Sequence, residues 1–199
     1  MSAAFTDEQL VERAQDGDRG ALGELLERYE RRTYNLAFRL MGNHADACDA
    51  AQEALVRVCI RLHNFRGDSA FSTWLYRVVT NTCLDELRRR GRLRHSSLDE
   101  AVPLEEGTVP RQAVDETEGP VECAERHEIQ AAVQRAINRL PYEYRIVVIL
   151  RDIQDLSYQE IASILGTTLG TIKSRLHRAR QALRTIIADT EGKCLDIAG

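Results

Sequence analysis

Cysteine and long apolar runs are scarce in this sequence of 199 residues, and each scarcity excludes a class of protein. The five cysteines lie far apart, at 48, 59, 83, 123 and 194, which argues against a disulfide framework or a zinc ribbon. No apolar run approaches the roughly 20 residues that span a bilayer, and the first residues lack the basic start and apolar stretch of a signal peptide. With 43% apolar and 29% charged residues, the composition is that of a globular protein, which we expect in the cytoplasm.

Charge is unevenly distributed along the chain, whose net charge is −4. Between residues 96 and 128, ten acidic residues stand against two arginines, a net of −8, so the remainder of the chain carries +4. The basic residues form two blocks, Arg88, Arg89, Arg90, Arg92 and Arg94, and Lys173, Arg175, Arg178, Arg180 and Arg184. This asymmetry predicts two basic surfaces joined by an acidic connector, although arginine-rich helix ends exposed to solvent would give the same pattern.

Helical periodicity extends through most of the chain, and the alternating runs that strands need are missing. We expect a short helix opened by a capping box at 6–9, a long helix ending at Gly42, a third helix with an apolar stripe over 51–62 and a fourth from Phe71 onward. Residues 96–120 hold three of the four prolines and no apolar period, which is typical of an extended or disordered linker. Four more helices are expected after it, with Pro141 at the start of the second and a capping box opening the third at Ser157.

The expected fold class is therefore all-α, with two small helical domains joined by a flexible acidic linker. We expect a first domain over 1–95, the linker over 96–120, a second domain over 121–188 and a tail over 189–199.

The two helices around Gly166 have the pattern of a helix-turn-helix unit. On a helical projection, the second of them turns Ile172, Leu176, Ala179 and Leu183 toward the core. Its opposite face carries donors and acceptors suited to base edges in a major groove, namely Lys173, Ser174, His177, Arg178 and Gln181. Arg175 and Arg180 flank this face, where they suit phosphates. An ordinary helical hairpin with a solvated basic face is the alternative.

A second polar face lies on the helix expected from Phe71. It carries Thr73, Arg77, Asn81 and Arg88, with Trp74 at its edge. Aromatic, amide and guanidinium groups together suit unstacked bases and a single-stranded backbone. Trp74 and Tyr76 would fit a helix core equally well.

An acidic face on the third expected helix is made by Asp46, Asp49, Gln52 and Glu53, and such a face is usually a solubilising surface. His44 and Cys48 form an i, i+4 pair on the same segment, but no further ligands stand at a credible spacing for zinc. We expect no metal, no cofactor, no catalytic residue and no small-molecule substrate.

Four blocks of this sequence resemble the extracytoplasmic-function (ECF) class of bacterial RNA polymerase sigma factors, in particular the envelope-stress sigma-E group. They are 46–54 (DACDAAQEA), 65–77 (FRGDSAFSTWLYR), 156–162 (LSYQEIA) and 170–180 (GTIKSRLHRAR), and the resemblance covers about residues 6–188. Two positions depart from the family pattern, since His177 stands where an aromatic residue is common and Lys173 where Arg is common.

The resemblance implies a factor that binds core RNA polymerase, recognises the minus-thirty-five and minus-ten promoter elements and opens the DNA for a stress regulon. It implies that Asp46, Asp49, Gln52 and Glu53 dock on the clamp coiled coil of the largest polymerase subunit. The minus-ten element would be read and melted by Phe65, Arg66, Asp68, Ser69, Phe71, Trp74, Arg77, Asn81 and Arg88. The minus-thirty-five element would be read by Thr171, Lys173, Ser174, Arg175, His177, Arg178 and Arg180.

The resemblance also implies that the linker threads the channel that nascent RNA later occupies, where its acidic charge mimics RNA. Promoter DNA, duplex and single-stranded, and an anti-sigma factor are the further partners implied. The chain would then be cytoplasmic, nucleoid-associated within holoenzyme, or held at the inner membrane by a membrane anti-sigma factor.

Two other functions fit parts of the sequence. A helix-turn-helix regulator would need only the second domain, and it leaves the blocks over 46–90 unexplained. A helical metal-dependent phosphohydrolase would need a His-Asp dyad, whereas the histidines at 44, 63, 95, 127 and 177 are scattered.

Overall fold

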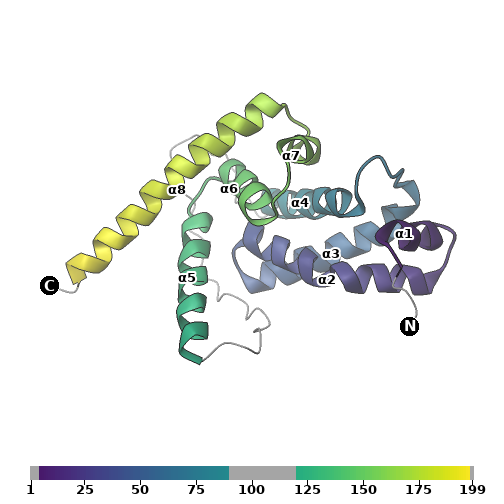
Figure 1. The fold of residues 1–199 in the computed structure, drawn as a ribbon, viewed down its shortest axis with the longest axis horizontal. Coiled ribbons are helices and arrows are strands. Elements are labelled where there is room, and N and C mark those ends of the chain that lie inside the picture. The colour runs from purple at the N-terminus through teal and green to yellow at the C-terminus, as the bar shows by residue number, and fades with distance from the viewer. Residues whose placement is uncertain (1–4, 90–119, 198–199) are drawn as a thin grey trace.

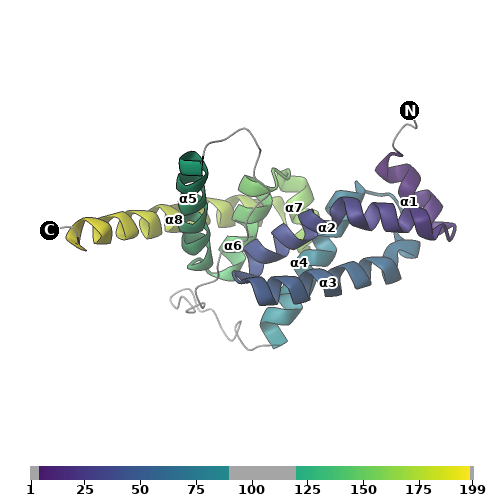
Figure 2. The ribbon, with the colours of Figure 1, turned by 90° about the horizontal axis from the view of Figure 1, so that it is seen from below.

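The first half of the chain is a group of four helices. In the computed structural model, the backbone is described over residues 5–89 and 120–197, and the side chains over 5–89 and 128–189. The helices are α1 (Asp7–Gln15), α2 (Arg19–Met41), α3 (His44–Arg61) and α4 (Phe71–Arg89), with a short 3-10 turn, η1 (Leu62–Asn64), after α3. The helices α2, α3 and α4 pack side by side, and α1 covers one end of them (Figures 1 and 2).

Local sequence signals set the ends of these helices. Thr6 and Gln9 form the predicted capping box of α1, and the Asp18 carboxylate caps α2. Gly42 ends α2 with a φ of 83°, in the left-handed region that glycine adopts without strain. Asn43 caps α3, which begins at His44 and therefore carries Asp46 and Asp49 as well as the predicted apolar stripe over 51–62.

The second half of the chain is also helical. It contains α5 (Pro120–Asn138), α6 (Tyr142–Val148), a π-helical turn η2 (Ile149–Ile153), α7 (Tyr158–Leu165) and the long α8 (Leu169–Ile197). Three predicted boundaries are confirmed: Pro141 stands at the N-cap of α6, Ser157 caps α7 through a capping box with Glu160, and Gly166 ends α7 with a φ of 61°.

The predicted linker and tail differ from the structure at their edges. Pro120, which the sequence places in the linker, begins α5, and α8 runs through Ile197 across most of the expected tail. The remainder of the predicted linker, 96–119, lies outside the described residues, as do Arg90, Arg92 and Arg94. Within the described ranges, every regular element is helical.

The two halves pack against each other. Figure 1 shows α7 beside α4, with α5 and α6 at the C-terminal end of α2. Buried apolar side chains form one hydrophobic cluster with members in both halves. Polar contacts also cross: Thr73 Oγ1 donates to Glu160 Oε1 at 3.0 Å, and Arg145 Nη1 donates to the Leu40 carbonyl at 3.0 Å. The sequence predicted both sets of helices but not this contact between them.

Candidate nucleic-acid interface and docking surfaces

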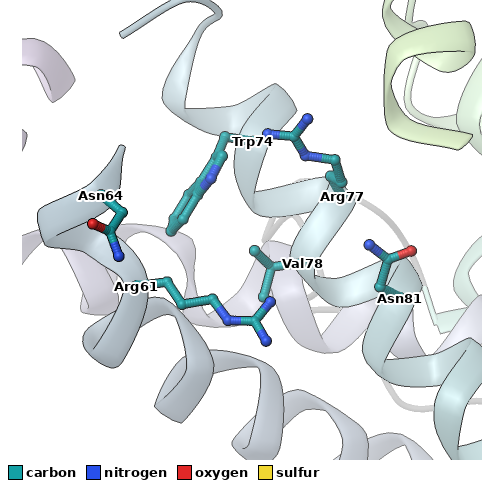
Figure 3. Close-up of a pocket in the computed structure, with 6 residues that line it drawn as sticks. All are labelled: Arg61, Asn64, Trp74, Arg77, Val78 and Asn81. Atoms are coloured by element: carbon teal, nitrogen blue, oxygen red, sulfur yellow. The ribbon is translucent and has the colours of Figure 1, made fainter. Parts of the chain in front are cut away.

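An open cavity of about 310 Å³ lies beside α4, on the face that the sequence assigned to unstacked bases (Figure 3). Its lining comes from three elements and consists of Arg61, Asn64, Trp74, Arg77, Val78 and Asn81. The Trp74 ring, two guanidinium groups and two amides surround one space. These are the groups that stack on a base, neutralise a phosphate and hydrogen-bond a base edge.

Trp74 is held in place by other aromatic rings. Its ring centroid lies 5.2 Å from that of Phe65 and 5.8 Å from that of Phe71, and Phe71 meets Tyr29 edge-on at 5.1 Å. Phe71 is only 5% exposed. The predicted DNA contact by Phe71 is therefore corrected. A buried ring has almost no surface available for DNA, and Phe71 instead packs against Trp74 and holds it in place.

The loop before α4 is fixed at its base and exposed at its tip. Gln15 Nε2 donates to the carbonyls of Leu62 and Phe65, at 2.8 Å each. Beyond Phe65, the chain passes through Gly67 with a φ of 75°, a conformation that residues with a Cβ rarely adopt. Arg66 and Asp68 are exposed on this loop and Ser69 is partly buried, so the predicted loop residues reach solvent near the cavity.

The other residues of the predicted polar face of α4 lie in different environments, and not all of them line the cavity. Arg88 is exposed near the end of α4 but does not line the cavity. Thr73 is buried against α7, and Tyr76 lies in the core, where burial raises the pKa of its hydroxyl. Trp74 is partly buried and lines the cavity, so the two aromatic residues that sequence could not separate have different environments.

Sequence reasoning missed Arg61 as a residue of the cavity, and it placed Asn64 at the start of the loop 64–71 expected at the minus-ten element without a role of its own. Arg61 is the last residue of α3, and Asn64 ends η1. Arg61 and Asn64 are both exposed, and in the sequence each looks like an ordinary polar residue at the end of a helix. Only the packing of α3 against α4 brings them to Trp74, so no local signal could have found them.

The helix-turn-helix face of α8 matches the predicted projection. Ile172, Leu176 and Ala179 are buried, while Lys173, Ser174, His177 and Arg178 are exposed, as is Gln181. The exposed set lies in the first turns of a helix that follows a tight turn, which is the arrangement that major-groove readers use. Thr171 Oγ1 lies 2.9 Å from Thr168 Oγ1, and this contact stabilises the start of the helix.

The two flanking arginines of α8 hold carboxylates. Arg175 Nη2 lies 2.9 Å from Glu143 Oε2, and Arg180 forms a two-nitrogen ion pair with Asp152. The hydrogen bond from Asp152 raises the pKa of Arg180. Both arginines can turn to a phosphate only by exchanging a protein carboxylate for it.

Of the four residues predicted to form an acidic face on α3, three are exposed and one is buried. Asp49, Gln52 and Glu53 are exposed, but Asp46 is 5% exposed. Its carboxylate accepts from Asn43 Nδ2, and its backbone N–H donates to Asn43 Oδ1, both at 2.9 Å. The assignment of Asp46 to the docking face is therefore corrected, because this side chain closes the N-terminus of α3.

Arg57 ties the acidic face to α4. Its guanidinium contacts Glu53 at 2.8 Å and Asp85 at 3.0 Å. These carboxylates raise the pKa of Arg57, with the Glu53 hydrogen bond as the largest cause. The acidic groups thus border a groove between α3 and α4 of about 410 Å³, into which Asp85 and Glu86 of α4 also face.

Two exposed apolar side chains on α3 were also missed. Val56 is 52% exposed and Ile60 is 63% exposed, one turn apart and beyond Gln52 and Glu53. In the sequence, every apolar residue of α3 could be assigned to its buried face. Only the structure shows that Val56 and Ile60 lie on the exposed face. An acidic patch continued by apolar groups is the composition of a protein-docking surface.

His44 and Cys48 are neighbours, as their spacing indicated. The Cys48 sulfur lies 3.7 Å from His44 Nε2, and His44 Nδ1 lies 2.7 Å from the Tyr34 hydroxyl. In the part of the chain that the structure describes, no group of three or more His, Cys, Asp or Glu residues could hold a metal ion. None of the helices described here is long and apolar enough to cross a membrane.

Comparisons with known proteins give one consistent family. Residues 25–93 match Sigma-70 region 2, and residues 130–183 match Sigma-70, region 4. The RNA polymerase sigma-H factor of Pseudomonas aeruginosa is 40% identical over 177 residues, which is 89% of this chain and 91% of that protein. The ECF RNA polymerase sigma-E factor of Escherichia coli is 39% identical over 183 residues, 92% of this chain and 95% of that protein.

Solved structures share the fold. The sigma factor RpoE of Bartonella quintana, in complex with the anti-sigma factor NepR, matches with a TM-score of 0.63 and 24% identity, over 83% of this chain and 96% of its own. CnrH, in complex with the cytosolic domain of CnrY, matches with a TM-score of 0.63 and 23% identity, over 92% of this chain and 97% of its own.

Proposed function

Because this chain belongs to the ECF class of bacterial RNA polymerase sigma factors, we propose that it binds core RNA polymerase and directs initiation at promoters with its two DNA-reading surfaces. The observation that carries the proposal at the level of residues is the cavity beside α4, because its ring, amides and guanidinium groups suit an extruded base. The ordinary helix-turn-helix regulator is set aside, since such a regulator has no need of a region 2 half.

At the minus-ten element, we assign stacking of an unpaired base to Trp74. Asn81 would hydrogen-bond the base edge, and Arg61 and Arg77 would neutralise the neighbouring phosphates. The loop would follow the displaced strand with Phe65, Arg66, Asp68 and Ser69, and Arg88 would meet the backbone further along α4. Holding a base outside the helix offsets an unpairing cost of a few kcal/mol, which favours the opened state.

At the minus-thirty-five element, the exposed face of α8 would enter the major groove. Lys173, Ser174, His177 and Arg178 face the base edges, with Thr171 at the helix start. Arg175 and Arg180 would reach phosphates at the flanks after releasing Glu143 and Asp152.

For polymerase docking, Asp49, Gln52 and Glu53 would meet basic groups on the clamp coiled coil of the largest subunit. Val56 and Ile60 lie on the same helix and would bury apolar area in that contact. Opposite charges would speed association, and the apolar pair would slow dissociation.

The proposed organisation is a region 2 domain over 1–95, a linker over 96–119 and a region 4 domain that begins with α5 at Pro120, with α8 continuing through Ile197. The linker would run in the polymerase channel for RNA. The chain would work in the cytoplasm as an initiation factor without catalysis of its own, with an anti-sigma factor as a further partner.

Transcription on two templates tests this function. With core polymerase, Asn81→Ala or Arg77→Ala should impair run-off initiation on closed duplex more than on a template already mismatched across the minus-ten region, which removes the unpairing cost. Arg31→Ala, an exposed arginine of α2 outside the cavity, is the matched control and should leave both templates unaffected.

Equal losses on the two templates would mean that Arg77 and Asn81 act only through the fold. No initiation by the unaltered chain with core polymerase, across a promoter library, would contradict the proposed function itself.

A further inference from the structure

We propose that Gln15, the last residue of α1, is a positioning residue for the cavity beside α4. By this proposal α1 takes part in promoter opening without touching DNA, because it fixes the part of the cavity wall that α4 does not supply. The inference rests on the proposed function, since it assigns a residue to the surface that holds the extruded base.

Gln15 binds a short turn at both of its ends. Its side-chain amide carries two N–H donors, and Nε2 donates to the Leu62 carbonyl and to the Phe65 carbonyl, at 2.8 Å each. The Leu62 carbonyl also accepts from the Phe65 N–H at 2.9 Å, which closes the turn η1. A single side chain of α1 therefore holds the first residue of η1 and the residue that follows the turn.

The turn carries part of the cavity wall. Asn64, the last residue of η1, lines the cavity, and so does Arg61, which immediately precedes the turn. The ring centroid of Phe65, the next residue, lies 5.2 Å from that of Trp74. Asn64 and Asn81 reach the same space from different elements, η1 and α4 (Figure 3). The separation of these two amides therefore depends on where η1 is held.

A single turn fixes the direction of Asn64 only weakly. η1 is one 3-10 turn, an element whose hydrogen bonds are less well aligned than those of an α-helix. Asn64 and Arg61 are both exposed, so core packing does not fix their side chains. A displacement of about 1 Å is enough to weaken a positioned contact severely. The two bonds from Gln15 supply the backbone restraint that this exposed turn needs.

The helix α1 is itself firmly anchored. Its Leu10 and Val11 are buried, and the Asp7 carboxylate accepts hydrogen bonds from Arg28 Nη1 at 2.6 Å and from the Tyr29 hydroxyl of α2. Contacts join α1 to α2, η1 and α4. The amide at the end of α1 therefore ties an exposed turn to the helical core.

Hydrogen exchange on the full chain tests the restraint independently of transcription. Gln15→Ala removes both donors, and Gln15→Glu keeps the shape of the side chain but presents only acceptors to the two carbonyls. In either variant, the backbone amides of 62–66 should exchange about tenfold faster than in the unaltered chain. Gln9→Ala is the matched control and should not change this exchange, because Gln9 lies on the same helix and its amide bonds Thr6 at the other end of it.

Promoter opening with core polymerase tests the consequence. Both Gln15 variants should slow the opening of closed duplex, followed by permanganate reactivity of unpaired thymines, about tenfold, the loss expected from one or two net hydrogen bonds. A template already mismatched across the minus-ten region should be affected less. Affinity for core polymerase should stay unchanged, since the proposed docking residues lie on the exposed face of α3. Gln9→Ala should leave the opening rate at its original value.

A double-mutant cycle separates positioning from general destabilisation. When Gln15 acts through the turn, Gln15→Ala should cause a smaller loss of opening in the Asn64→Ala variant than in the unaltered chain, because one group that it positions is already gone. General destabilisation would give losses that multiply. Circular dichroism identifies a Gln15 variant that fails to fold, and the other variant then decides.

Faster exchange at 62–66, with slower opening and losses that do not multiply, supports the inference. Unchanged exchange in both Gln15 variants, or multiplying losses in the cycle, would overturn it. If exchange rises but opening is slowed only by Arg77→Ala and Asn81→Ala, Gln15 is not a positioning residue and the proposed function stands. If none of these variants slows opening, the proposed role of the cavity fails, and the inference fails with it.

Discussion

The basic residues of α8 differ in what they hold. Arg175 and Arg180 are paired with Glu143 and Asp152, whereas Lys173 and Arg178 point outward from the same helix. An arginine that must exchange one anion for another gains little selectivity among base sequences. An arginine aimed at base edges gains most of its energy from them.

Arg178→Ala should therefore cost about 1–3 kcal/mol at one or two base positions and relax preference there. Arg180→Ala should weaken all promoters alike and lower the salt slope by roughly one unit. The measurement is a promoter-library selection with each holoenzyme at two salt concentrations. A uniform loss from Arg178→Ala, with a changed base preference from Arg180→Ala, would show that the projection of α8 is out of register.

The thiols of Cys59 and Cys83 differ as sharply. Cys59 is exposed on α3, while Cys83 is buried in α4, where burial raises its pKa to about 12. At pH 8, a maleimide should label Cys59 rapidly and Cys83 only after unfolding, as peptide mass spectrometry can follow.

The same burial makes stability depend on pH. The folded thiol stays protonated from about pH 8.5, where an unfolded cysteine ionises, up to about pH 12, so the free energy of unfolding should fall over this window. In the Cys83→Ala variant, this thiol contribution to the pH dependence of the free energy of unfolding should be absent. Melting temperatures measured between about pH 8.5 and pH 12 check this. Labelling of Cys83 at the rate of Cys59 would contradict its burial.

At the scale of elements, α3 shows what local sequence signals can and cannot predict. The capping boxes of α1 and α7 and the glycines that end α2 and α7 were predictable because each boundary depends on residues three or four apart. The apolar stripe of α3 does not mark the first residue of the helix, because its first turns are rich in small residues. The Asn43–Asp46 pair, a cap residue and an acid three positions on, was the available signal.

The docking face of α3 gives the prediction at this scale. Asp49→Arg with Glu53→Arg should slow association with core polymerase and weaken the complex, since both residues are exposed and reverse the charge of the face. Val56→Ser with Ile60→Ser should instead speed dissociation. Circular dichroism should not change in either case.

Glu27→Arg with Glu30→Arg, two exposed acids of α2, is the control for charge reversal alone. Full retention of core affinity by the α3 variants in a surface-binding assay would remove α3 from the docking surface.

At the scale of the whole molecule, the unpredicted feature is the contact between the halves. From the sequence alone, Gln134, Asn138 and Arg145 look like polar residues exposed to solvent. Their hydrogen-bond partners are backbone carbonyls about a hundred positions away in the chain. Every residue has a backbone carbonyl, so a hydrogen bond to one does not require a particular residue type at the partner position. Such a contact therefore leaves no pattern in the sequence. The same holds for the cavity, where Trp74, Arg77 and Asn81 were predicted from one helix and Arg61, on another helix, was not.

The aromatic wall of the cavity has an optical consequence. Trp74 is the single tryptophan of the chain, so its indole dominates the intrinsic emission of the protein when excited near 295 nm (Figure 3). Every change in its spectrum reports on one wall of one cavity, without a background from other indoles. The molecule thus carries a built-in fluorophore at the position where a nucleobase would quench it.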